Sequence, residues 1–174
     1  MATKTELTAA LADWDGRSKA AIQTIYATWA GDPDLPALLV ESAAREDLQV
    51  AATWLLKHGI ENRSINVADV QVDLLRVLDR ITASDACLHV LQIIDRFQIP
   101  KTTRRRVERF VRRCLAAENK FLLTWAYAGF HALASQHAEY REEVSELLEH
   151  AEATGSAATR ARVRKLKAQG FRDA

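Results

Sequence analysis

The stretch ENKFLLTWAYAGFHALA, residues 118–134, decides the fold of this chain. Apolar and small residues follow one another through it without alternation or turn residues, so the pattern predicts one helix over residues 119–136. Asn119 stands where this helix starts, and its short side-chain oxygen suits the N-cap position. The apolar residues from Phe121 to Phe130 surround the helix, which predicts burial between neighbouring helices. Residues 85–98 show the same pattern, and the two helices are expected to form the spine of the core.

Helices with apolar periodicity recur along the chain in pairs. The second helix of each pair is expected to begin after a good N-cap residue, and these residues lie 38, 34 and 37 residues apart: Asp47, Asp85, Asn119 and Ser156. A helix–cap–helix unit at a nearly fixed period is typical of a solenoid, in which neighbouring units bury one continuous core. The predicted fold class is therefore all-α, in a single domain over residues 1–174 with about five helix pairs. The pairs are expected at residues 4–30, 34–58, 67–98, 102–136 and 139–168.

Residues 104–168 resemble HEAT repeats. The second helix of that family places an aliphatic pair, a small residue, a small and a large apolar residue, and then a leucine. The corresponding residues here are Leu122, Leu123, Ala126, Gly129, Phe130 and Leu133. The resemblance implies a HEAT-like solenoid, a right-handed α-α superhelix. Stacked helix pairs of this kind form an extended surface that binds other macromolecules.

The composition limits the classes of function. The chain has 174 residues, of which 48% are hydrophobic and 27% charged, and its formal net charge is +1. Attraction to nucleic acid or to an anionic membrane would therefore need a local patch of charge. Cys87 and Cys114 share no short motif, which argues against a disulfide framework or a zinc site and suits a reducing compartment. We expect no signal peptide and no apolar run of the roughly 18 residues that span a membrane, hence a cytoplasmic protein without membrane contact.

A basic helix is predicted from KTTRRRVERFVRR, residues 101–113. At about 100° per residue, Arg105, Arg109 and Arg112 fall on one side, with Arg106 and Arg113 beside them. The helix expected at the C-terminal end is basic as well. The candidate residues for binding a macromolecule are Arg105, Arg106, Arg109, Arg112, Arg113, Arg160, Arg164 and Lys167.

Two interpretations of these basic residues are open. The helix expected at residues 139–153 carries six glutamates and one arginine, so it can cancel the charge of residues 101–113 inside the molecule. Each exposed pair would contribute only about 0–1 kcal/mol. Alternatively, the basic helices 101–113 and 160–167 bind nucleic-acid phosphates.

No motif for nucleophilic catalysis, phosphate cradling or dinucleotide binding occurs in the sequence. His89 and His131 lie in apolar helices, where hydrogen-bonded structural histidines are expected because a metal site needs several converging ligands. The tryptophans are expected to fill the core and the contacts between helices. We therefore expect no catalytic residue, no metal and no cofactor. The expected function is a non-catalytic helical-repeat scaffold for another macromolecule, with a protein partner first and nucleic acid as the alternative; the oligomeric state stays open.

Overall fold

The computed structural model describes residues 3–171, and their fold is all-α, as predicted. Helices make up 75% of the structure, and the described residues contain no strand. The chain divides into two compact units, Met1–Ile93 and Ile94–Ala174. The single domain over residues 1–174 and its right-handed superhelix of about five pairs stay predictions.

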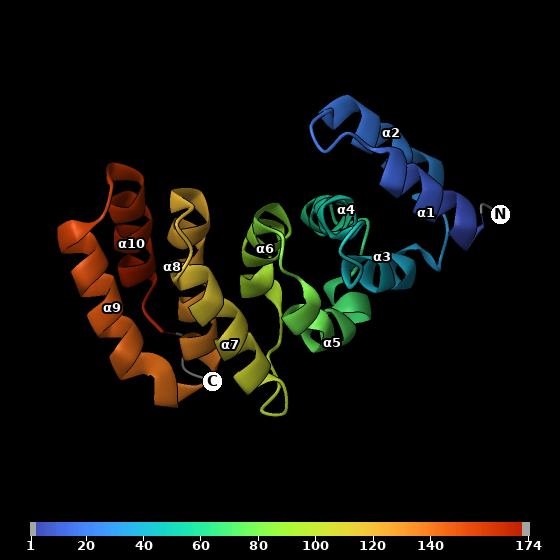
Figure 1. Cartoon of the computed structure of the whole chain (residues 1–174). Coiled ribbons are helices and arrows are strands. Elements are labelled where there is room, and N and C mark those ends of the chain that lie inside the picture. Colours follow the sequence, from blue (N-terminus) through green and yellow to red (C-terminus); the bar gives the residue numbers. More distant parts are fainter. Residues whose placement is uncertain (1–2, 172–174) are drawn as a thin grey trace. The chain divides into compact units, whose positions relative to one another are not determined.

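The first unit has six α-helices among its described residues. They are α1 (Lys4–Asp13), α2 (Lys19–Trp29), α3 (Leu35–Ala43), α4 (Gln49–Glu61), α5 (Val67–Val77) and α6 (Ser84–Leu91), and a 3-10 helix, η1 (Leu78–Arg80), follows α5. Helix α3 packs against α4 and α5, whereas α4 also packs against α1, α2 and α6 (Figure 1). Leu55 and Leu56 of α4 have 0% exposure. Helix α4 is therefore the central helix of this unit.

The N-caps predicted for α4 and α6 are wrong. Helix α4 begins at Gln49, and the Asp47 carboxylate instead accepts hydrogen bonds from Arg45 Nε and Nη2, at 3.2 and 2.8 Å. The Gln49 N–H donates to the Arg45 carbonyl at 2.9 Å, so the preceding turn supplies an acceptor that a side-chain cap would otherwise provide. Helix α6 begins at Ser84, which places Asp85 inside its first turn.

A buried glutamine connects α4 to the start of α6. Gln49 has 0% exposure, and its Oε1 accepts from the backbone N–H groups of Thr82 and Ala83 at 2.7 and 2.8 Å. One turn further along α4, Thr53 Oγ1 lies 3.1 Å from His89 Nδ1 of α6. His89 is therefore a hydrogen-bonded structural histidine, as predicted.

The predicted helix over residues 85–98 is shorter in the structure. Helix α6 ends at Leu91, and a separate 3-10 helix, η2 (Ile94–Arg96), opens the second unit. The apolar residues of this stretch are nevertheless buried as predicted, since Val90, Ile94 and Phe97 are at most 2% exposed.

The second unit has four α-helices among its described residues. They are α7 (Arg104–Leu115), α8 (Lys120–Gln136), α9 (Arg141–Thr154) and α10 (Ala157–Gln169), and a 3-10 helix, η3 (Ala138–Tyr140), precedes α9. Helix α8 packs against α7, α9 and α10, and Figure 1 shows α8 and α10 side by side. Phe110 of α7 and Phe130 and Leu133 of α8 are at most 1% exposed. These residues form the centre of the core of this unit.

Both N-caps predicted in the second unit are confirmed. Asn119 Oδ1 accepts hydrogen bonds from two backbone N–H groups of the first turn of α8, at 2.9 and 3.1 Å. Ser156 Oγ accepts from the Thr159 N–H at 3.2 Å and starts α10. Thr159 Oγ1 in turn lies 2.9 Å from Thr124 Oγ1, so a buried hydrogen bond joins α8 and α10 near their N-terminal ends.

The prediction that α8 is buried on all sides is wrong. Its inner face is buried, with Phe130 and Leu133 in the core, but Phe121 is 73% exposed and Trp125 is only half-buried. The physical reason is that α7, α9 and α10 cover only part of the surface of α8. The first two turns of α8 therefore present aromatic side chains beside α10.

Candidate functional site

The basic face of α7 points toward solvent, as its pattern predicts. The opposite face is buried through Val107, Phe110, Val111 and Cys114. The side chains of Arg105 and Arg112 are 68% and 42% exposed. Arg109 and Arg113 are exposed as well, and Arg106 is half-buried.

Two glutamates, Glu108 and Glu143, accept hydrogen bonds from the arginines at the centre of this basic face. Arg105 Nη1 donates to Glu108 Oε2 at 2.9 Å, and Arg112 Nε and Nη2 donate to Glu108 Oε1 at 3.1 and 3.0 Å. Arg112 also forms a bidentate pair with Glu143 of α9, at 2.6 and 2.8 Å. Tyr140 OH donates to Glu108 Oε2 at 2.9 Å. We call these five residues the Glu108 network.

The hydrogen bonds of the Glu108 network change the ionisation of its members. Burial raises the pKa of Glu108, but the hydrogen bonds from Arg105, Tyr140 and Arg112 outweigh it, and the pKa is lowered overall. The hydrogen bond between Arg112 and Glu143 lowers the pKa of Glu143 and raises the pKa of Arg112. Four of the five N–H groups of Arg112 already donate to carboxylates, which leaves one for a phosphate.

The interpretation that residues 139–153 balance the charge of α7 is confirmed for two arginines. Arg112 pairs with Glu143, and Arg104 Nε lies 3.0 Å from Glu139 Oε1. The other candidates on α7 also interact with residues of the chain: Arg106, Arg109 and Arg113. Every candidate arginine of α7 therefore has a contact within the molecule.

The basic candidates of α10 are engaged by different partners. Glu152 of α9 accepts from Arg164 Nε at 3.0 Å and from Lys167 Nζ at 2.8 Å. Arg160 Nη1 donates to the Gly155 carbonyl at 3.0 Å. The hydrogen bonds of the candidates on α7 and of those on α10 thus go to separate acceptors, and these contacts do not join the two sets into one site.

A groove between α8 and α10 was missed by sequence reasoning. It has a volume of about 470 Å³. We call it the α8–α10 groove and define it by residues that line it: Lys120, Phe121, Trp125, Ala161, Arg162 and Lys165. No local pattern in the sequence indicates this groove, because it depends on how α8 packs against α10.

The Arg162 side chain closes one wall of the α8–α10 groove. Its guanidinium carbon lies 3.6 Å from the centroid of the Trp125 ring, a cation–π contact. Burial lowers the pKa of Arg162, and the attraction of Asp95 opposes this effect. The contact covers one face of the Trp125 ring, whereas Phe121 stays largely uncovered at 73% exposure.

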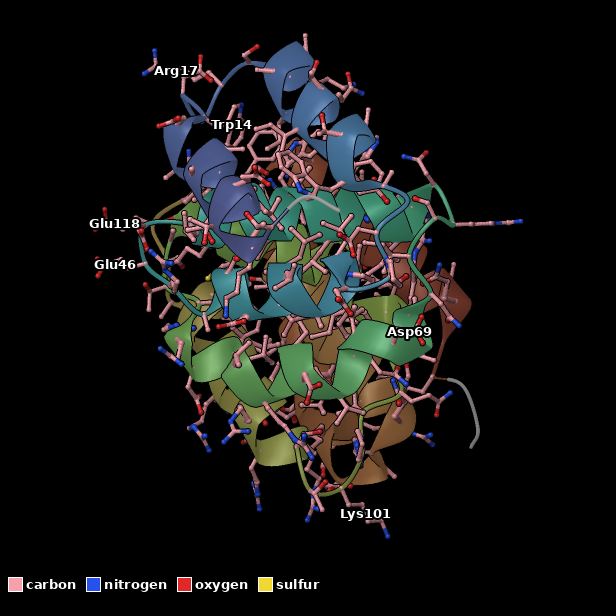
Figure 2. The ribbon with its side chains drawn as sticks, turned by 90° about the vertical axis from the view of Figure 1, so that its right-hand side faces the viewer. Trp14, Arg17, Glu46, Asp69, Lys101 and Glu118 are labelled. Atoms are coloured by element: carbon pink, nitrogen blue, oxygen red, sulfur yellow. The ribbon has the colours of Figure 1, made fainter. Side chains whose placement is uncertain are left out.

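Two other hollows lie away from the α8–α10 groove. A hollow of about 650 Å³ beside η2 and α8 includes Gln136, whose side chain accepts from the Ile99 N–H at 2.8 Å and donates to the Phe97 carbonyl at 2.9 Å. A hollow of about 250 Å³ in the first unit is lined by Trp14, Trp54 and other residues. Figure 2 shows Trp14 in the connection between α1 and α2. All four tryptophans are half-buried, which agrees with packing between helices, but none of them lies in the core as was also expected.

Ligands for a metal do not converge within residues 3–171, where no group of three or more His, Cys, Asp or Glu side chains could hold an ion. Cys87 and Cys114 are buried free thiols. Over the same residues, no helix combines the length and the apolar character needed to cross a membrane.

Comparison with known proteins gives no match to a protein-family model, to a curated protein or to a solved structure. A functional conclusion has to come from the chemistry of particular residues, because a fold class by itself hosts many functions.

Proposed function

We propose that the chain is a non-catalytic helical-repeat scaffold, similar to HEAT repeats, that binds another protein at the α8–α10 groove. The observation that carries the proposal is the exposed aromatic side chain of Phe121 next to the half-buried ring of Trp125. Full burial of a phenylalanine side chain contributes about 1.5–3 kcal/mol, so a partner that covers Phe121 gains binding free energy. Aromatic anchors in a partly enclosed groove are typical of the residues that dominate protein interfaces.

Equivalent contacts in the two units support the repeat part of the proposal. In the first unit, Thr53 of α4 bonds His89 of α6, and in the second unit Thr124 of α8 bonds Thr159 of α10. These hydrogen bonds join residues 36 and 35 positions apart, and each links the second helices of two successive pairs. Solenoids stack successive repeats through such neighbour contacts. The right-handed superhelix over residues 1–174 is part of this proposal.

The pairing of the arginines favours a protein partner over nucleic acid. The carboxylates paired with Arg112, Arg164 and Lys167, which are Glu108, Glu143 and Glu152, offset the positive charge of these candidates and would repel a phosphate. Nucleic-acid affinity depends on the attraction of basic side chains for phosphates, which these carboxylates weaken. Nucleic acid is therefore the alternative partner that a crosslinking experiment has to exclude.

Site-specific crosslinking tests this proposal. The photo-reactive analogue benzoylphenylalanine replaces Phe121 in cells that make the chain, and the matched control places it at Val72, another large apolar residue, which is 41% exposed. We expect discrete protein adducts from position 121 that are missing from position 72. Adducts with nucleic acid at position 121, or the same adducts at both positions, would overturn the proposal.

A further inference from the structure

The α8–α10 groove carries positive charge that the described chain does not neutralise. Within residues 3–171, no carboxylate forms a salt bridge with Lys120, Arg162 or Lys165, although Asp95 attracts Arg162 from a longer distance. The arginines of the Glu108 network, by contrast, are paired with carboxylates. The complement of this groove is therefore an anionic ligand with apolar surface.

One wall of the groove is a single face of α10. Its wall on α10 consists of residues at a spacing that places them on one helical face: Ala158, Ala161, Arg162 and Lys165. Two of these are alanines, so the backbone of a ligand can approach α10 closely. The wall spans two turns, and a bound helix of about three turns would cover it and reach Phe121 of α8.

The number of open aromatic ring faces distinguishes a peptide ligand from a single-stranded nucleic acid. Single strands bind on several open aromatic faces, on which successive bases stack. Arg162 lies 3.6 Å over the Trp125 ring and covers that face, so of the two aromatic rings of the groove only Phe121 is open. One open ring with three flanking cations suits a peptide that combines one large apolar side chain with carboxylates.

We propose that the α8–α10 groove binds an acidic amphipathic helix of a partner protein. A large apolar side chain of that helix packs on Phe121, and its carboxylates face Lys120 and Lys165. Amphipathic helices bind grooves in this manner through anchors one turn apart. This inference rests on the proposed protein-binding function and specifies the chemistry of the partner.

Fluorescence anisotropy with defined probes tests the inference on the full chain. The first probe is a labelled synthetic peptide of about 14 residues that a side-chain staple keeps helical, with leucines at positions i, i+3, i+4 and i+7, glutamates beside them and alanines elsewhere. The second has lysines in place of the glutamates, and the third is an oligothymidylate of similar length. The groove variants are Phe121→Ser and Lys165→Glu. The matched controls are Val72→Ser and Lys101→Glu, of which Lys101 lies in the loop before α7 (Figure 2).

We expect the acidic helix to bind with micromolar affinity, and each groove variant to weaken it by about tenfold or more, with the controls within about twofold. Circular dichroism of the variants confirms that they are folded. Equal binding of the acidic and basic helices, tighter binding of the oligothymidylate, or unchanged affinity in the groove variants would overturn the inference. Protein adducts from position 121 without binding of the acidic helix would overturn this inference alone, and the scaffold function would stand.

Discussion

Replacement of Glu108 with glutamine removes the central negative charge of the Glu108 network and keeps the shape of the side chain. The carboxylate accepts four hydrogen bonds, two of them from Arg112, one from Arg105 and one from Tyr140, at 2.9 to 3.1 Å. A glutamine has only one acceptor oxygen, so its amide nitrogen must face either the Arg112 donors or the other two donors. In both orientations two of the four hydrogen bonds are lost.

The expected size of the effect follows from the exposure of the partners. Hydrogen bonds to charged groups contribute about 1.5–3 kcal/mol when water is excluded, whereas exposed ion pairs contribute about 0–1 kcal/mol. The Glu108 side chain is 14% exposed, but those of Arg105 and Arg112 are 68% and 42% exposed, so solvent screens the interaction in part. We expect Glu108→Gln to lower the free energy of unfolding by about 1–2 kcal/mol.

Urea unfolding of the full chain, followed by circular dichroism, measures this loss at low salt and at about 1 M salt, where the screening length is about 3 Å. The loss should shrink at high salt. The matched control is Glu152→Gln in the same unit, whose side chain is 29% exposed and pairs with Arg164 and Lys167. A loss for Glu108→Gln that is no larger than the loss for this control would refute the conclusion that Glu108 holds Arg105 and Arg112 within the molecule.

Three further substitutions test the packing of the first unit. Gln49→Ala should lower the free energy of unfolding by about 1–3 kcal/mol, because the backbone N–H groups of Thr82 and Ala83 lose their acceptor; an unchanged urea midpoint would show that water replaces it. Gly59→Ala should lower the free energy of unfolding by about 1–3 kcal/mol, because the added Cβ would lie 2.5 Å from Ile65 Cδ1 and 2.7 Å from Tyr26 OH. An unchanged melting temperature would mean that both side chains move aside. Burial lowers the pKa of His89 from 6.5 to about 4, so the unfolded chain binds the proton first and stability falls as the pH drops from 6.5 toward 4. Between pH 7 and 5.5 this amounts to about 1 kcal/mol, and His89→Gln, measured by urea unfolding at both pH values, should remove that part of the pH dependence; equal slopes for the two proteins would contradict the assignment.

Local signals predicted much of the second unit. Asn119 and Ser156 cap α8 and α10 because each cap needs only amides of the next turn, which the sequence itself places nearby. The apolar spacing of α7 likewise predicts its buried face correctly. Asp47 failed as a cap for an equally local reason, since Arg45 two residues earlier supplies both the partner of its carboxylate and a carbonyl for the first turn of α4.

Contacts between residues that are distant in the sequence could not be predicted from local patterns. Gln49 accepts from amides 33 and 34 residues further along the chain, and no periodicity indicates such a partner. The exposure of Phe121 depends on which sides of α8 its neighbours cover, and the contact of Arg162 with Trp125 depends on how α8 packs against α10. The groove therefore emerges only when the packed helices are known, whereas the arginines of α7 are conspicuous in the sequence and are mostly engaged in the structure.

An NMR titration of the isotope-labelled full chain with the acidic helical peptide tests most directly which surface of the second unit binds. We expect the largest chemical-shift changes at Phe121, at the Trp125 indole N–H and around Arg162, with the amides near Arg105 and Arg112 unchanged. The largest changes along α7, with the α8–α10 groove unaffected, would contradict the assignment of the groove as the binding surface.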